Sequence, residues 1–195
     1  MTKNIKLSFY YSQILFFILL PIWIELTKYL HPIVIGVVWF CITFAFLFGV
    51  CWIKKETIRL PKAFLHIFIV LYSFGLLILL FFRPNGASYG GVSLIPFDTI
   101  SFYLSGNVNF FIALYNLAAN IGLFVPYGLY YRYLNGVSSW KRLMLITVIS
   151  ISMIECLQFS TKRGSLDIDD LILNVLGVLL GYLIYPLFEK VFAVE

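Results

Sequence analysis

Long apolar runs separated by short polar or basic segments divide the chain from one end to the other. A helix needs about 20 mostly apolar residues to cross the hydrocarbon core of a membrane. The pattern therefore predicts an all-α integral membrane protein, a bundle of about six transmembrane helices in a single polytopic domain over residues 1–195. The predicted spans are 8–30, 33–53, 63–82, 109–131, 143–159 and 169–192.

Two segments of this pattern need a separate interpretation. The run 8–30 is longer than the core of a signal peptide and is not followed by a small-residue cleavage site, so we predict a retained first span. The connection 84–108 contains NGASYGG and SLIPFDTI, whose glycines, prolines and serines exclude a spanning helix. Its leucines, isoleucines and phenylalanines predict a long, partly interfacial loop between the third and fourth helices.

Composition and charge placement agree with a membrane location. Hydrophobic residues make up 62% of the chain and charged residues 12%, whereas about a quarter of a soluble domain is charged. The net charge is +5, but the basic residues form short clusters between apolar runs and no continuous basic face, which excludes nucleic acid as a partner. The cysteines Cys41, Cys51 and Cys156 lie inside apolar runs and are interpreted as structural thiols.

The basic clusters also predict the orientation. The two ends of the chain and the connections after the second and fourth spans carry ten Lys and Arg residues, and the opposite side carries four. Cytoplasmic connections are the ones enriched in Lys and Arg. Both termini are therefore predicted to be cytoplasmic, and the connections 84–108 and 160–168 are predicted to face outward.

Polar side chains gather near the outer ends of three predicted helices. An ionisable group near the bilayer centre costs about 2.5–3.5 kcal/mol and indicates a functional site. Glu155 and Gln158 lie one turn apart on the fifth helix, and Asn116 and Asn120 are four residues apart on the fourth. The sixth helix adds Asp167, Asp170 and Asn174 on one face and Asp169 on another, and Arg163 lies in the connection above. We predict that Arg163 is coupled electrostatically to these carboxylates.

These polar residues have structural interpretations as well as functional ones. Asn116 suits a hydrogen bond between helices, Asp169 and Asp170 suit a helix N-terminus, and Glu155 suits a structural pair with Arg163. As functional groups, Glu155, Asp167 and Asp170 are the candidate catalytic residues. No cofactor is predicted, and a divalent cation held by carboxylate oxygens is the weaker alternative.

Small residues and one proline predict how the helices pack. Gly177 and Gly181 form a GxxxG motif on the same side of the helix as Asn174, which permits a close contact between helices. Pro126 predicts a kink in the fourth span, which frees the carbonyl of Gly122. Leu179 is expected to face lipid.

Four segments together resemble the VanZ-like family. They are SLIPFDTI (93–100), NIGLFVPYG (120–128), IECLQ (154–158) and RGSLDIDDLILNVLGVLLGY (163–182). They follow the order and spacing of the family and define a VanZ-like core over 93–182, whereas the first three spans show no comparable signature. The resemblance carries over, as candidate binding residues, Asn120, Glu155, Gln158, Arg163, Asp167, Asp169, Asp170 and Asn174.

The resemblance implies a multi-pass protein of the bacterial plasma membrane that lowers susceptibility to lipoglycopeptide antibiotics of the teicoplanin type. The expected partners are membrane lipid and either the drug or a lipid-linked cell-wall precursor, engaged through a polar outer cleft. Two alternatives stay open: an enzyme that modifies a lipid-linked or phosphate-bearing envelope substrate, and a transporter. No pattern in the sequence predicts an oligomeric state.

Overall fold

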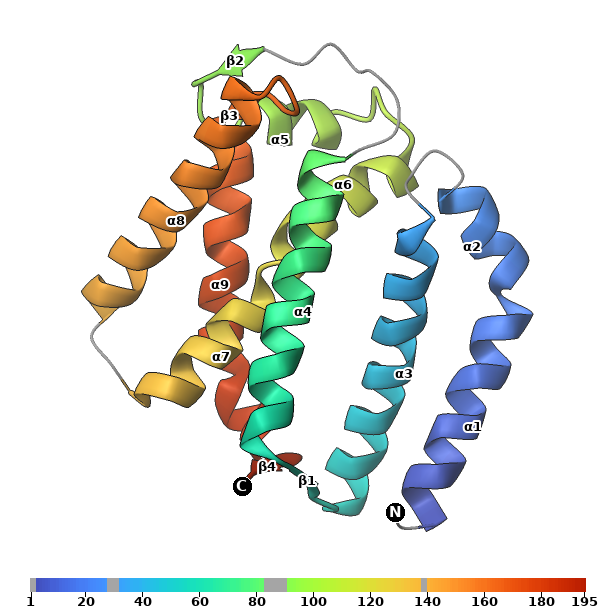
Figure 1. Cartoon of the computed structure of the whole chain (residues 1–195). Helices are drawn as coiled ribbons and strands as arrows, with labels where there is room; N and C mark the ends of the chain where they lie inside the picture. Colours follow the sequence, from blue (N-terminus) through green and yellow to red (C-terminus); the bar gives the residue numbers. More distant parts are fainter. Residues whose placement is uncertain (1–2, 28–31, 83–90, 138–139) are drawn as a thin grey trace. The chain divides into compact units, whose positions relative to one another are not determined.

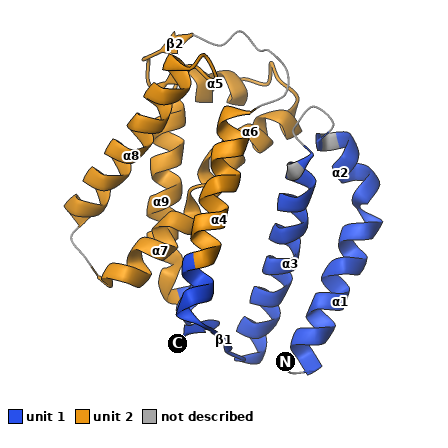
Figure 2. Ribbon diagram, viewed as in Figure 1, with its two compact units in different colours: residues 1–66, 187–195 blue, residues 67–186 orange. Residues whose placement is uncertain are grey.

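The structure is a computed structural model that describes residues 3–27, 32–82, 91–137 and 140–195. The chain divides into two compact units: residues 1–66 with 187–195 form unit 1, and residues 67–186 form unit 2 (Figure 2). The helices α4 (Lys62–Phe81) and α9 (Ile168–Glu189) contribute residues to both units. The predicted end of the first span at 28–30 and the loop segment 84–90 lie outside the described residues, as do Lys28 and Arg83.

The chain is an all-α multi-pass membrane protein. Within the described residues, 5 segments are long and apolar enough to cross a membrane: 34–54, 62–81, 110–135, 140–160 and 168–189. They correspond to the second to sixth predicted spans. The predicted count of six is not confirmed, because the run 8–30 forms two shorter helices, α1 (Lys3–Ile18) and α2 (Leu20–Thr27).

The break between α1 and α2 has a local cause. Pro21 has no N–H to donate to the carbonyl of Phe17, so the helical ladder is interrupted there. Helical hydrogen bonds continue on both sides, from Leu19 N to the Leu15 carbonyl (3.1 Å) and from Trp23 N to the Leu19 carbonyl (3.0 Å). Both α1 and α2 contact α3 (Ile33–Lys54), so in unit 1 they run beside it as one kinked helix (Figure 1).

A two-stranded parallel sheet ties together one end of unit 1. Strand β1 (Ile58–Leu60), in the connection after α3, pairs with β4 (Phe192–Val194) near the C-terminus. The side-chain amide of Asn4 donates to Glu56 Oε1 in the same connection (2.7 Å). The last predicted span, 169–192, is therefore too long: α9 ends at Glu189 because the next residues leave the helix to form the strand.

Unit 2 contains most of α4 and α9, together with α6 (Phe110–Gly122), α7 (Val125–Asn135) and α8 (Trp140–Ser160). The connections between α4 and α6 and between α8 and α9 form β2 (Val92–Ser93), α5 (Asp98–Leu104) and β3 (Leu166–Asp167). The buried apolar core comes from the three helices α4, α8 and α9 and from the α6–α7 junction: Leu76, Leu80, Phe124, Leu143, Ile151, Val175, Val178 and Tyr182. Leu179, expected to face lipid, instead packs partly buried against this core.

Glycines allow α9 to pack closely against α6 and α7, as the GxxxG motif predicts. A Cβ atom on Gly177 would lie 2.1 Å from the carbonyl oxygen of Ile121, and one on Gly181 would lie 2.0 Å from that of Val125. Gly128 makes the reciprocal contact from α7, where a Cβ would lie 1.9 Å from the carbonyl oxygen of Val178. These helices touch backbone to backbone, so larger residues do not fit.

The predicted kink at Pro126 is a complete break between α6 and α7. Two tyrosines hold this break against α4. Tyr72 donates its hydroxyl to the carbonyl of Leu123 (3.0 Å), and the Tyr127 hydroxyl donates to Ser73 Oγ (3.0 Å). An exposed carbonyl at membrane depth is costly, so the hydroxyl of Tyr72 stabilises the broken helix.

Candidate functional site

Asp169 is fully buried and fixes the start of α5. Its two carboxylate oxygens accept hydrogen bonds from the backbone N–H groups of Phe97 (2.6 Å) and Ile100 (3.0 Å). The first N–H groups of a helix have no partner within the helix, and a carboxylate is a favourable acceptor for them. Asp169 therefore caps a helix, as one of the structural interpretations suggested, but the helix that it caps is α5 and not its own.

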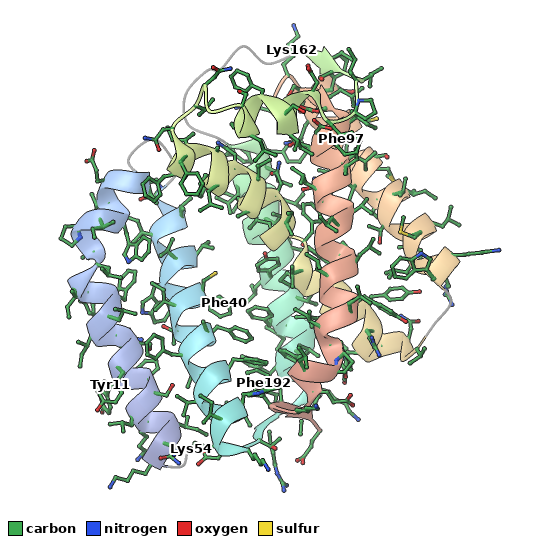
Figure 3. All side chains as sticks on the ribbon, turned by 180° about the vertical axis from the view of Figure 1, so that it is seen from behind. Tyr11, Phe40, Lys54, Phe97, Lys162 and Phe192 are labelled. Carbon is green, nitrogen blue, oxygen red and sulfur yellow. The ribbon has the colours of Figure 1, made fainter. Side chains whose placement is uncertain are left out.

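Phe97, at the N-terminus of α5, has a left-handed backbone with φ of 68°. A bulky residue adopts this conformation only where the surroundings hold it there, at a cost of about 1–3 kcal/mol. The hydrogen bond from Phe97 N to Asp169 is such a constraint. Figure 3 labels Phe97 at the end of unit 2 where Lys162 also lies.

Asp167 also connects α5 with the start of α9, but by different contacts. Its Oδ1 accepts from the backbone N–H of Asp169 (2.9 Å), which makes it the N-terminal cap of α9, and its Oδ2 accepts from the Thr99 hydroxyl (2.7 Å). The strands β2 and β3 pair beside it in parallel, with Ser93 opposite Asp167. The connection before α6 and the connection before α9 are thus fastened to each other at one end of unit 2.

Asp170 and Asn174 line the face of α9 below this cap. Asn120 of α6 donates its side-chain amide to Asp170 Oδ1, so the structure brings these two predicted residues together. Asn174, one turn further along, is 5% exposed, and its Oδ1 has no hydrogen-bond partner within the described part of the chain. Asn116 does not join them, because its amide donates to the carbonyl of Ile112 in its own helix (2.9 Å).

Glu155 and Gln158 are buried on α8, with 6% and 7% of each residue exposed. Gln158 Nε2 donates to the carbonyl oxygen of Leu80 (3.0 Å), which links α8 to the end of α4. Gly164 lies against this glutamine, and a Cβ added there would be 3.1 Å from Gln158 Cβ. The predicted one-turn spacing thus places a carboxylate and an amide on the interior face of α8.

Arg163 lies in the connection after α8, as predicted, but contacts a different group than expected. Its guanidinium carbon is 5.7 Å from the centre of the Phe82 ring, a cation–π arrangement. Among the residues that the structure describes, no ion pair joins Arg163 to a carboxylate of α8 or α9. The coupling to carboxylates expected from the sequence, including the pair with Glu155, is therefore not seen within the described chain.

These contacts define a buried polar layer, consisting of Asn120, Glu155, Gln158, Asp167, Asp169, Asp170 and Asn174. Two of its carboxylates, Asp167 and Asp169, accept hydrogen bonds from the connection before α6 and from the backbone, and so position that connection. Within the described chain no group of three acidic, histidine or cysteine side chains is placed to hold a metal ion. Within the described chain, the side-chain oxygen of Asn174 is a buried acceptor of this layer without a hydrogen-bond partner.

A row of exposed apolar side chains beside this layer was not recognised as part of the site from the sequence. The segment 92–111 exposes more than half of each of Val92, Leu94, Ile95, Phe97, Phe102, Leu104, Phe110 and Phe111. We call these eight residues the apolar rim. For the six rim residues up to Leu104 the signal was present as the apolar content of the predicted interfacial loop, whereas Phe110 and Phe111 belonged to the predicted fourth span. The hydrogen bonds that fix the loop to α9 join residues about 70 positions apart.

The apolar helices identify a multi-pass membrane protein. The buried polar layer and the apolar rim mark a candidate site at one end of unit 2. The chain belongs to the VanZ/LLP1 family, whose model matches residues 64–189. The match contains every residue of the polar layer and also includes α4, which had shown no family signature in the sequence. No curated protein and no solved structure matches the chain.

Proposed function

We propose that this VanZ-like protein lowers susceptibility to lipoglycopeptide antibiotics of the teicoplanin type. It acts at the outer leaflet of a bacterial plasma membrane, where it engages the drug or the lipid-linked cell-wall precursor that the drug binds. The family supports a role related to antibiotic resistance. The geometry of unit 2 supports a site for a molecule with both an acyl chain and a polar head.

The proposal rests on the attachment of the segment that carries the apolar rim to the polar layer. Asp169 binds the backbone of Phe97 and Ile100, so the rim is attached to the same helix that carries Asp170 and Asn174. Exposed apolar residues of a membrane protein at an interface favour contact with acyl chains. An amphiphile would place its acyl chain along the rim and its polar head towards the layer.

The unpartnered acceptor on Asn174 supports a polar contact inside the layer. A buried oxygen without a hydrogen bond costs about 1–3 kcal/mol, and a ligand N–H or O–H would remove this cost. Lipoglycopeptides and peptide-bearing precursors both present many such donors. Asn120 and Asp170, which bond to each other one turn away, would orient the bound group.

The test is drug susceptibility of a deletion strain complemented at matched expression with the wild-type protein or with Phe97→Ala, Asn174→Leu and Leu183→Ala. Leu183 is 57% exposed on α9 and belongs to neither the polar layer nor the apolar rim, so its variant controls for the loss of an exposed apolar side chain. Phe97→Ala and Asn174→Leu should protect less than the wild type. We expect the wild type and Leu183→Ala to raise the inhibitory concentration of a lipoglycopeptide, but not that of a glycopeptide without an acyl chain. Equal susceptibility with and without the wild-type gene would overturn the proposal.

Mass spectrometry of the lipid-linked precursors from the same strains identifies how the protein acts. Under a binding mechanism, the precursors have the same masses with and without the protein. A precursor with a changed mass would instead indicate an enzyme that modifies it, with Glu155 and Asp170 as the first carboxylates to substitute.

A further inference from the structure

Unit 1 carries an apolar groove that is unrelated to the polar layer of unit 2. It has a volume of about 300 Å³ and is lined by Phe48, Gly49, Trp52 and Ile53 of α3 and by Leu187 of α9. Gly49 opens the groove, because a Cβ added at this position would meet no atom within 4 Å. The groove lies in the last turns of a helix that is apolar and long enough to span a membrane, so its natural surroundings are acyl chains.

Two lysines lie close to one end of this groove, Lys190 by contact and Lys54 by its place in the chain. The ammonium of Lys190 lies 5.4 Å from the centre of the Trp52 ring, and Lys54 follows Ile53 as the last residue of α3. Within the described chain neither lysine forms an ion pair, and the nearby Glu195 is already paired with Arg59 (3.3 Å). An ammonium on the face of an indole still has donors free for an anion.

The excess of basic groups extends over this whole end of unit 1. The N-terminal residues, the connection after α3 and the C-terminal segment carry seven basic side chains and three acidic ones. The basic residues are Lys3, Lys6, Lys54, Lys55, Arg59, Lys62 and Lys190, and the acidic residues are Glu56, Glu189 and Glu195. Strand pairing and the contact between Asn4 and Glu56 bring these segments to one place.

We propose that the groove binds an anionic phospholipid of the surrounding leaflet. One acyl chain lies against Phe48, Gly49 and Leu187, and the phosphate contacts Lys190 and Lys54. Trp52 lies between the two parts of the lipid, which suits an indole ring with one apolar side and a preference for the membrane interface. Basic pockets of this kind at the ends of membrane helices favour anionic head groups. The site is independent of the function proposed for unit 2.

The shape of the site is tested with the full-length protein in lipid nanodiscs of mixed phosphatidylglycerol and phosphatidylcholine, followed by native mass spectrometry of the lipids that stay bound. Gly49→Phe fills the groove and should remove the retained phosphatidylglycerol. Gly36→Phe is the matched control, since Gly36 is on the same helix and a Cβ there also meets nothing within 4 Å. Equal retention in both variants would overturn the groove as the binding site.

The charge of the site is tested with Lys190→Gln, and Lys141→Gln on α8 is the control. Removing one ammonium near the phosphate should lower the preference for phosphatidylglycerol over phosphatidylcholine by about fivefold. The control should retain the wild-type preference, and both variants should keep the wild-type unfolding temperature. A wild-type protein that retains the two lipids in proportion to their abundance would contradict the proposal, as would an equal effect of Lys190→Gln and Lys141→Gln.

Discussion

The carboxylate of Asp169 helps to fix the position of the connection before α6. It accepts two backbone hydrogen bonds from α5 while fully buried. In Asp169→Asn the amide nitrogen faces an N–H donor, so one hydrogen bond is replaced by a repulsive contact and the charge is lost. Hydrogen bonds to charged groups contribute roughly 1.5–3 kcal/mol each, and the free energy of unfolding should fall by a similar amount.

Thermal unfolding of the purified protein in detergent measures this loss, and Asp98→Asn is its control. Asp98 lies in the first turn of α5 and is exposed. The control should unfold within a degree or two of the wild type, whereas Asp169→Asn should unfold several degrees lower. Similar unfolding temperatures for the two variants would show that the contact from α9 does not hold α5.

Asn174 allows function to be separated from stability. Its side-chain oxygen is buried without a partner within the described chain, so Asn174→Leu replaces an unsatisfied polar group by an apolar one of similar size. We expect an unchanged or higher unfolding temperature together with reduced protection in the susceptibility assay. A variant that is as protective as the wild type would remove Asn174 from the binding site.

At the scale of the elements, the contact of α9 with α6 and α7 is the closest packing in unit 2 that glycines create. In Gly181→Ala the new methyl group would meet the carbonyl oxygen of Val125 at 2.0 Å, so the helices must move apart. Overpacking of this kind typically costs about 1–3 kcal/mol. Gly122→Ala is the control at the end of α6, where a Cβ meets nothing within 4 Å. Thermal unfolding should show a clear decrease for Gly181→Ala and little change for Gly122→Ala.

The elements that the sequence predicts well are those determined by local pattern. The spans 33–53, 63–82 and 143–159 agree with α3, α4 and α8 to within a few residues, because each is a continuous apolar run between polar ends. The close packing at Gly177 and Gly181 was predicted as well, because both glycines of the GxxxG motif lie in one helix and their spacing can be read from the sequence. Its partner Gly128 was not, because an isolated glycine carries no periodic signal.

Elements that depend on distant partners were missed or placed wrongly. The pairing of β1 with β4 joins residues far apart in the chain through strands of 3 residues, too short for a recognisable alternating pattern. The capping of α5 by Asp169 likewise needs the folded backbone. Arg163 was assigned to the carboxylates because they are near in sequence, whereas its guanidinium lies over the ring of Phe82.

At the scale of the whole molecule, hydrogen bonds between connections show which loops lie together within each unit. The pairing of β2 with β3 places the connections before α6 and α9 together at one end of unit 2. The pairing of β1 with β4 and the contact of Asn4 with Glu56 place both chain ends beside the connection after α3 in unit 1. The distribution of Lys and Arg predicts that the loops within each group share one side of the membrane, and this stays a prediction.

The last prediction assigns these two groups of connections to opposite faces of the membrane. The helix α4 begins at Lys62, beside the connection that contains β1, and ends at Phe81, before the connection that contains β2. It is apolar and long enough to span, so the two groups lie on different sides if it crosses the membrane once.

Single cysteines at Ser93 and Ser165, in a chain whose three native cysteines are replaced by serine or alanine, should react with a membrane-impermeant maleimide in intact cells. Cysteines at Lys3, Thr57 and Val194 should react only after the cells are opened, because basic connections stay in the cytoplasm. Labelling of Lys3→Cys alone in intact cells would mean that α1 and α2 do not cross together as a sixth span. Labelling of Thr57→Cys and Val194→Cys from outside would reverse the orientation and place the apolar rim on the cytoplasmic leaflet.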